Sequence, residues 1–258
     1  MSDSMFQLTN RDYAHFYFED FDLDAQLIAI RGALAAARSA ASQETDEIEA
    51  LAKRANEIGS DHLVGMWTDE IHASVYHDAA RSAAAVGMLA PFIENLFVGI
   101  FRGIGKMGED MLGHDSESER SVRAVAGFWD PHFAYAKREI RDDLVTGILQ
   151  LSVASKLEPH LPADLKTVLE ALFGYRNKVL HNGFEWPVDE RESFANRVKT
   201  WPAGWFESAT SNGRPWVWYF SDAFIERVVE LIDEVLDAAG QHVRLHFAPE
   251  IGSNEKDA

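Results

Sequence analysis

The stretch that decides the fold runs from residue 162 to residue 183 and reads PADLKTVLEALFGYRNKVLHNG. Its apolar residues recur at steps of three and four, which is the repeat of a helix with one buried face. They are Leu165, Val168, Leu169, Leu172, Tyr175 and Val179. The Asn182-Gly183 pair that follows favours the left-handed backbone with which helices end. The sequence therefore predicts an amphipathic helix that stops just beyond residue 180.

Three polar residues lie at the end of this predicted helix. Each helical residue turns by about 100°, so Asn177 and His181, four apart, stand on nearly the same face. Arg176 leaves the helix about 140° away from His181 and needs its long side chain to converge with them on one small cleft. A permanent cation beside a ring that gives or takes a proton suits phosphodiester cleavage.

The order Arg176, Asn177, three further residues and His181 resembles the Rx4-6H signature of the HEPN superfamily. Many members of that superfamily are metal-independent endoribonucleases of toxin-antitoxin, abortive-infection and other defence systems. The specific match covers about six residues, with helical context around it. The resemblance implies an all-α bundle, a homodimer whose two motifs meet in a cleft, and RNA cleavage with the 2′-hydroxyl as nucleophile.

By position, the resemblance implies that Arg176 and His181 are the catalytic pair, and that Asn177 is the polar residue that often follows the Arg. RNA would be the substrate, and an antitoxin or regulatory protein a further partner. One subfamily has a Tyr two places after the His, where this chain has Gly183. Control by modification of such a Tyr is therefore not implied.

Other interpretations of the motif stay open. An Arg and a His near a helix C-terminus often do no more than interact favourably with the last carbonyls. Some members of the superfamily are non-catalytic, so the resemblance also allows a helical module that binds a nucleotide or a protein partner. No acidic residue stands out as a third catalytic group. Glu185, Asp142 and Asp143 are candidates for orienting the ring of His181.

Composition bounds the class of protein. With 258 residues and 47% hydrophobic content, the chain has ample material for a core, as one large domain or two small ones. Asp plus Glu number 42 against 24 Lys plus Arg, a net charge of −18, so the overall field repels nucleic acid. This counts against a non-specific nucleic-acid coat, while a locally basic cleft still admits RNA, and the acidic exterior suits a basic partner.

The chain contains no cysteine, which excludes disulfides, thiolate metal sites and thiol nucleophiles. The start, Met1 to Asp12, lacks the basic-then-apolar order of a signal peptide. The strongest apolar stretch, Ala83 to Ile104, is interrupted by Pro91, Glu94, Asn95 and Arg102. We expect a cytoplasmic protein without a membrane segment.

Hydrophobic periodicity predicts an all-α, antiparallel helical bundle with a small β-hairpin insert near the C-terminal helix. We expect residues 1–60 to form an N-terminal helical extension, residues 61–248 a HEPN-like bundle, and residues 249–258 a disordered tail. Besides the motif helix, helices are predicted over residues 23–41, 46–89, 92–107, 121–129, 135–157, 187–198 and 222–247, with an acidic loop at 108–119. Ser221 is the expected cap of the last helix.

Interruptions of these helices are predicted at three places. Residues 42–46 interrupt the first tract weakly, Gly59-Ser60 is a possible break, and Pro91 ends or kinks its helix. Residues 201–220 differ in composition from the helical tracts before them, with two Pro and four Trp. A hairpin that turns at Asn212-Gly213 is plausible there.

Two further patterns suggest ligands. Residues 103–108 match the dinucleotide-binding glycine pattern, but they end a helical tract instead of joining a strand to a helix, which favours a flexible helix exit. His72 and the His77-Asp78 doublet, with His62 upstream, suggest a metal phosphohydrolase. However, His72 and His77 point about 140° apart on a helix, which favours partly exposed helical residues. We expect neither a cofactor nor a metal.

The Trp-rich segment has two interpretations. Aromatic rings bind unpaired nucleobases by stacking, so Trp201, Trp205, Trp216 and Trp218 could hold RNA. Packing of the hairpin against the bundle or against a dimer partner is the stronger expectation.

Overall fold

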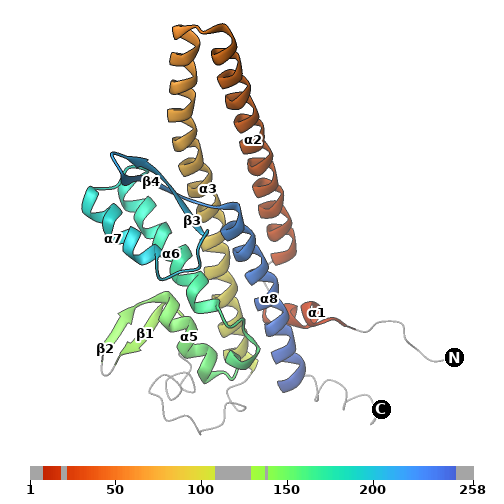
Figure 1. Ribbon diagram of the computed structural model, residues 1–258. Helices are drawn as coiled ribbons and strands as arrows, with labels where there is room; N and C mark the ends of the chain where they lie inside the picture. The colour runs from red at the N-terminus through yellow and green to blue at the C-terminus, as the bar shows by residue number, and fades with distance from the viewer. Residues whose placement is uncertain (1–7, 19–21, 108–128, 137–138, 248–258) are drawn as a thin grey trace, which may run out of the picture. The chain divides into compact units, whose positions relative to one another are not determined.

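The computed structural model describes residues 8–18, 22–107, 129–136 and 139–247 (Figure 1). These residues are mostly helical, with two small antiparallel hairpins. By their contacts they form two compact units, one within residues 1–23, 91–170 and 230–258, the other within residues 24–90 and 171–229. Helices α3 (Asp61–Met107), α6 (Leu165–Asn182) and α8 (Asp222–His246) belong partly to each unit.

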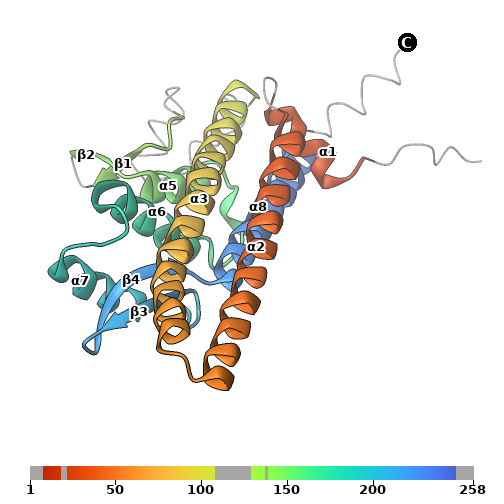
Figure 2. The same ribbon diagram turned by 90° about the horizontal axis from the view of Figure 1, so that it is seen from above.

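The second unit is built on a long helical hairpin of α2 (Leu23–Ile58) and the first half of α3, which lie side by side in Figures 1 and 2. Gly59, in the left-handed region at φ 65°, ends α2 and confirms the predicted break. The predicted interruption at residues 42–46 is wrong. Half-buried Ala41, Glu44 and Ile48 continue the helical spacing through it, and Glu44 pairs there with His77 and Arg81 of α3, so one partly buried face spans the segment.

Pro91 does not end α3. A proline inside a helix removes one backbone hydrogen bond and crowds the preceding turn, which weakens an isolated helix. Here Leu89, Ala90, Phe92 and Ile93 are buried on both sides of it, while Pro91 itself is exposed. Burial of the flanking apolar side chains therefore outweighs the local cost, and the expected helix at residues 92–107 is the second half of α3.

The first unit holds a short N-terminal segment, α1 (Asn10–Ala14) and the 3-10 helix η1 (His15–Tyr17), together with α5 (Leu144–Ala154) and the 3-10 helix η2 (Glu158–His160). Thr9 and Asp12 cap α1 reciprocally. The N-terminal segment packs closely on this unit: a Cβ on Gly240 of α8 would lie 1.6 Å from the Asn10 carbonyl oxygen.

The predicted helix at residues 135–157 is wrong in its first half. Strands β1 (Phe133–Ala136) and β2 (Glu139–Asp142) form an antiparallel hairpin, with Phe133 opposite Asp142. The Gln150 side chain accepts a hydrogen bond from the Tyr135 amide (2.9 Å) and donates one to the Tyr135 carbonyl (2.8 Å). These bonds hold the backbone extended, and the helix starts only after Asp143, whose carboxylate accepts from the Thr146 amide.

The hairpin predicted before the C-terminal helix is confirmed. Strands β3 (Phe206–Ser211) and β4 (Arg214–Phe220) pair antiparallel, and the turn residues Asn212 and Gly213 have φ values of 52° and 73°. Two successive left-handed residues define the tight turn that Asn-Gly favours. Ser221 caps α8 by accepting from the Phe224 amide at 3.2 Å, as predicted, and α7 (Val188–Val198) matches the helix expected there.

The packing expectation for the Trp-rich segment is confirmed for three of its rings. Trp201, Trp205 and Trp218 are buried. Trp201 stacks on Phe206 with 5.2 Å between ring centroids, and Trp205 lies 4.8 Å from Phe224. The rings therefore hold the hairpin and α8 together.

Of the described helices, α3 is long and apolar enough to cross a membrane by length and composition. Sixty-one per cent of its apolar window is buried inside the protein, which is how the core helix of a soluble protein behaves. The features predicted for residues 108–119, for residues 121–128 and for the tail from residue 249 lie outside the described residues.

Candidate functional site

The motif helix is α6, and its C-terminal end is fixed by the residues that follow it. The helix ends at Asn182 and Gly183 follows at φ 69°, which confirms the predicted stop at the Asn182-Gly183 pair. The Gly183 amide donates to the Val179 carbonyl at 3.0 Å, and the Asn182 side chain donates to the Lys178 carbonyl at 3.2 Å. The carbonyls of Lys178 and Val179 in the last turn of α6 are thus satisfied locally.

One face of α6 is anchored by aromatic packing. Tyr175 is fully buried, its ring lies 4.4 Å from that of Phe220, and its hydroxyl donates to the Trp218 carbonyl at 2.9 Å. Burial raises the pKa of the Tyr175 phenol, so the hydroxyl stays protonated as a donor. Trp186 continues the cluster after the helix end and donates from Nε1 to the Gly183 carbonyl at 2.8 Å. This packing orients α6 and determines which residues face solvent.

The three predicted site residues leave α6 away from that anchored face. Asn177 and His181 are exposed, one turn apart, as their spacing predicts. Arg176 is half-buried, and its guanidinium lies 5.8 Å from the centre of the Phe173 ring, one turn toward the helix N-terminus. The structure therefore brings Asn177 and His181 onto one open face, whereas the Arg176 side chain lies against Phe173, toward the other end of the helix.

Two of the three residues considered for orienting the His181 ring, Glu185 and Asp143, have other partners. Glu185 accepts hydrogen bonds from the Tyr76 hydroxyl and from Trp216 Nε1, the latter at 2.9 Å. The hydrogen bond to Glu185 raises the pKa of Tyr76. Asp143 is the N-cap of α5, and Asp142 ends β2. Glu185 thus fastens the loop after α6 to α3 and β4.

This fastening was not predicted from the sequence. Tyr76 lies 109 positions before Glu185, and Trp216 lies 31 positions after it. No local pattern relates residues so far apart, and only the packing of the two helices against the hairpin brings them together. The role of Glu185 is therefore visible only in the folded chain.

One histidine of α3, His77, is engaged in an ion-pair network with Glu44 of α2. Glu44 pairs with His77 Nδ1 at 2.6 Å and with Arg81 at 2.9 Å, and Arg81 also pairs with Asp78. Burial raises the pKa of Glu44, but the hydrogen bonds from His77 and Arg81 outweigh it, so that the pKa is lowered overall. Burial also raises the pKa of Asp78, and its bond with Arg81 opposes that effect only in part.

Among the described residues, no three or more His, Cys, Asp or Glu side chains gather in a geometry that could hold a metal ion. The glycine pattern at residues 103–108 begins inside α3, and Gly108 lies outside the described part of the chain. A Cβ on Gly103 would lie 2.6 Å from the Tyr17 ring, and one on Gly105 would lie 2.4 Å from the Trp129 ring. These two glycines serve close helix packing, so the alternative of a flexible helix exit is wrong for them.

Comparison with protein-family models, with curated proteins and with solved structures found no match for the chain.

Proposed function

We propose that this chain is a HEPN-like, metal-independent endoribonuclease of a toxin-antitoxin, abortive-infection or other defence system, acting in the cytoplasm as a homodimer. The observation that carries the proposal is the open face at the end of α6. Asn177 and His181 are exposed there, and half-buried Arg176 directly precedes Asn177 in the chain. Side chains required for RNA chemistry must reach solvent, and this face meets that condition.

The proposed reaction follows from the chemistry of the three side chains. The Arg176 guanidinium binds oxygens of the scissile phosphate and stabilises the charge that builds on them. His181 takes the proton from the RNA 2′-hydroxyl, whose oxygen attacks the phosphorus as the bond to the 5′-oxygen breaks. His181 of the partner subunit donates a proton to that leaving oxygen. The products carry a 2′,3′-cyclic phosphate and a 5′-hydroxyl, and Asn177 positions the phosphate or the ring.

A homodimer supplies what one copy lacks. One imidazole cannot readily act as base and as acid in the same step, whereas two copies facing each other supply one ring for each task. Leu180, 67% exposed, and Phe184, 36% exposed, flank His181 in sequence and offer apolar surface to a second copy. The dimer cleft would then be closed by residues adjacent to the catalytic ones.

The second candidate is a non-catalytic helical module that binds a nucleotide or a protein, and the net charge of −18 favours it. A strongly acidic exterior slows the approach of RNA and promotes recruitment of basic proteins. The two candidates differ in what the loss of Arg176 or His181 would change. It would abolish RNA cleavage by the nuclease, and it would affect only binding by the module.

The proposal is tested by incubating the purified protein with total RNA in EDTA, beside Arg176→Ala and His181→Ala. His62→Ala, at an exposed histidine near the start of α3, is the matched control. We expect the native protein and the control to degrade RNA, and each site variant to be slower by at least about 100-fold. Intact RNA with the native protein, or equal cleavage by His181→Ala, would contradict the proposal.

A further inference from the structure

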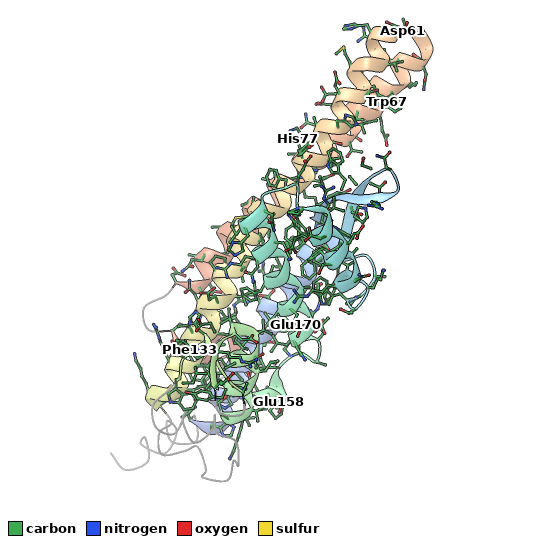
Figure 3. The ribbon with its side chains drawn as sticks, turned by 90° about the vertical axis from the view of Figure 1, so that its left-hand side faces the viewer. Asp61, Trp67, His77, Phe133, Glu158 and Glu170 are labelled. Carbon is green, nitrogen blue, oxygen red and sulfur yellow. The ribbon has the colours of Figure 1, made fainter. Side chains whose placement is uncertain are left out.

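The α2–α3 hairpin ends in a segment that we call the hairpin tip, residues 45–72. It contains the last part of α2, the turn at Gly59-Ser60 and the start of α3. Figure 1 shows these helix ends extending beyond α7 and the β3–β4 hairpin of the same unit. In Figure 3, Asp61 marks the far end and Trp67 lies between it and His77. At its base His72 lies 6.3 Å from the Trp216 ring of β4, and the rest of the hairpin tip extends beyond the other elements of its unit.

A narrow apolar seam holds the two helices of the hairpin tip together. Ala55 is buried, and Ile48, Leu51, Leu63 and Trp67 are half-buried at spacings of three and four on their helices. Ile58 follows Ala55 by three residues and continues the seam, yet it is 60% exposed. The seam is thus left open at its end.

Beside the seam, α3 carries a second apolar row. Val64 is 44% exposed and Ile71 is 37% exposed. Seven residues apart, they lie within about 20° of the same helix face, two turns from each other. Val64 and Ile71 form an apolar strip on α3, and Ile58 is a further exposed apolar residue of the hairpin tip. Another helix could add its own apolar face to this strip, as helices do in a three-helix arrangement.

The charge of the hairpin tip is one-sided. Its seven carboxylates, all exposed, are Asp46, Glu47, Glu49, Glu57, Asp61, Asp69 and Glu70. Lys53 and Arg54 are its two basic residues, which leaves a net charge of −5. None of the seven carboxylates forms an ion pair with another described residue. The apolar strip therefore belongs to a segment whose negative charge is not compensated by ion pairs within the described residues.

This charge selects among possible occupants of the strip. A second copy of the same hairpin tip would also carry a net charge of −5, and like charges that face each other oppose association. Nucleic acid and anionic membrane surfaces are repelled for the same reason. A helix with one apolar stripe flanked by Lys and Arg would bury the apolar strip and pair its basic side chains with the carboxylates.

We propose that the hairpin tip is a docking surface for a basic, amphipathic helix of a partner protein. The apolar stripe of that helix covers Ile58, Val64 and Ile71, and its basic flanks face the carboxylates of the hairpin tip. This inference does not rest on the proposed nuclease activity. It is independent of Arg176 and His181, and a non-catalytic module would dock its partner in the same way.

The test measures, by fluorescence anisotropy, binding of the 258-residue chain to a synthetic 18-residue peptide of Leu and Lys with helical spacing. A scrambled peptide of equal composition keeps the charge and loses the stripe. The variant Val64→Ser/Ile71→Ser removes the strip, and Ile28→Ser, at a 69% exposed residue of α2 outside the hairpin tip, is the matched control. Circular dichroism verifies that every variant remains helical.

We expect the striped peptide to bind the native protein and Ile28→Ser equally, and to bind the double variant about tenfold more weakly. The scrambled peptide should bind all three proteins weakly and alike. Equal binding of both peptides, no binding of the striped one, or no loss in the double variant would overturn the proposal. So would sedimentation that shows a native dimer which the double variant alone converts to monomers, because the strip would then be a self-interface.

Discussion

His242 of α8 is a buried titratable residue held between two partners of the same unit. Its Nδ1 lies 2.6 Å from the Tyr17 hydroxyl, and its Nε2 lies 2.8 Å from the Ser155 carbonyl oxygen. Because a carbonyl can only accept, Nε2 carries the proton and Nδ1 accepts from Tyr17. Burial lowers the pKa of His242 to about 4, and the nearby His246 and His160 act in the same direction.

This arrangement predicts a loss of stability in mild acid. The unfolded chain takes up a proton on His242 below its ordinary pKa of 6.5, whereas the folded protein does so only below about 4. The contribution of His242 to the free energy of unfolding is therefore fully present above pH 6.5. About 3 kcal/mol of it is lost as the pH falls toward 4. The free energy of unfolding, measured by urea titration across this range, should fall more steeply for the native protein than for His242→Gln. Parallel pH profiles would contradict this account.

At the scale of elements, Ser82 joins α3 to β4. Its hydroxyl donates to the Asp78 carbonyl at 2.9 Å and accepts from the Phe220 amide at 2.8 Å, and Ser82 is 2% exposed. The amide at the end of β4 therefore finds its partner on a helix instead of on another strand. This bond fixes the hairpin that packs against Tyr175, and through it the orientation of α6.

Removing this hydroxyl should loosen the hairpin. Ser82→Ala leaves a buried amide without its acceptor, which costs about 1–3 kcal/mol of unfolding free energy. Ser74→Ala, at a half-buried serine of α3 whose hydroxyl donates only to the Ile71 carbonyl, is the control and should change stability by less than about 0.5 kcal/mol. Urea denaturation monitored by Trp fluorescence measures both. Equal stability of the two variants would mean that the α3–β4 bond contributes nothing.

Elements fixed by local residues were predictable from the sequence, and elements fixed by contacts from other segments were not. Asn212-Gly213 and Ser221 were predictable because a turn type and a cap depend on one or two local residues. The hairpin at residues 133–142 was not, because its backbone is held by Gln150 from the following helix. The continuity of α3 through Pro91 likewise depends on burial of the flanking residues, which the local rule for proline does not include.

At the scale of the whole molecule, the described chain is two compact units that share three of its helices. The periodicity of the sequence predicted the mostly helical content and the position of the motif helix, because both follow from repeating apolar residues. The division into units follows from long-range contacts, which periodicity does not encode. The exposed face of α6 was predictable in part, because helical spacing places Asn177 and His181 together. The environment of Arg176 was not predictable, because it depends on the folded chain.

The central claim is that side chains at the exposed end of α6 promote cleavage of RNA by the RNA's own 2′-hydroxyl. The most direct measurement is a time course in EDTA with one labelled RNA oligonucleotide and its counterpart that carries 2′-deoxy sugars throughout. The account predicts that the native protein cuts only the RNA and leaves 2′,3′-cyclic phosphate ends, and that His181→Ala leaves both oligonucleotides intact. Cleavage of the deoxy counterpart, or an RNA that stays whole with the native protein, would contradict it.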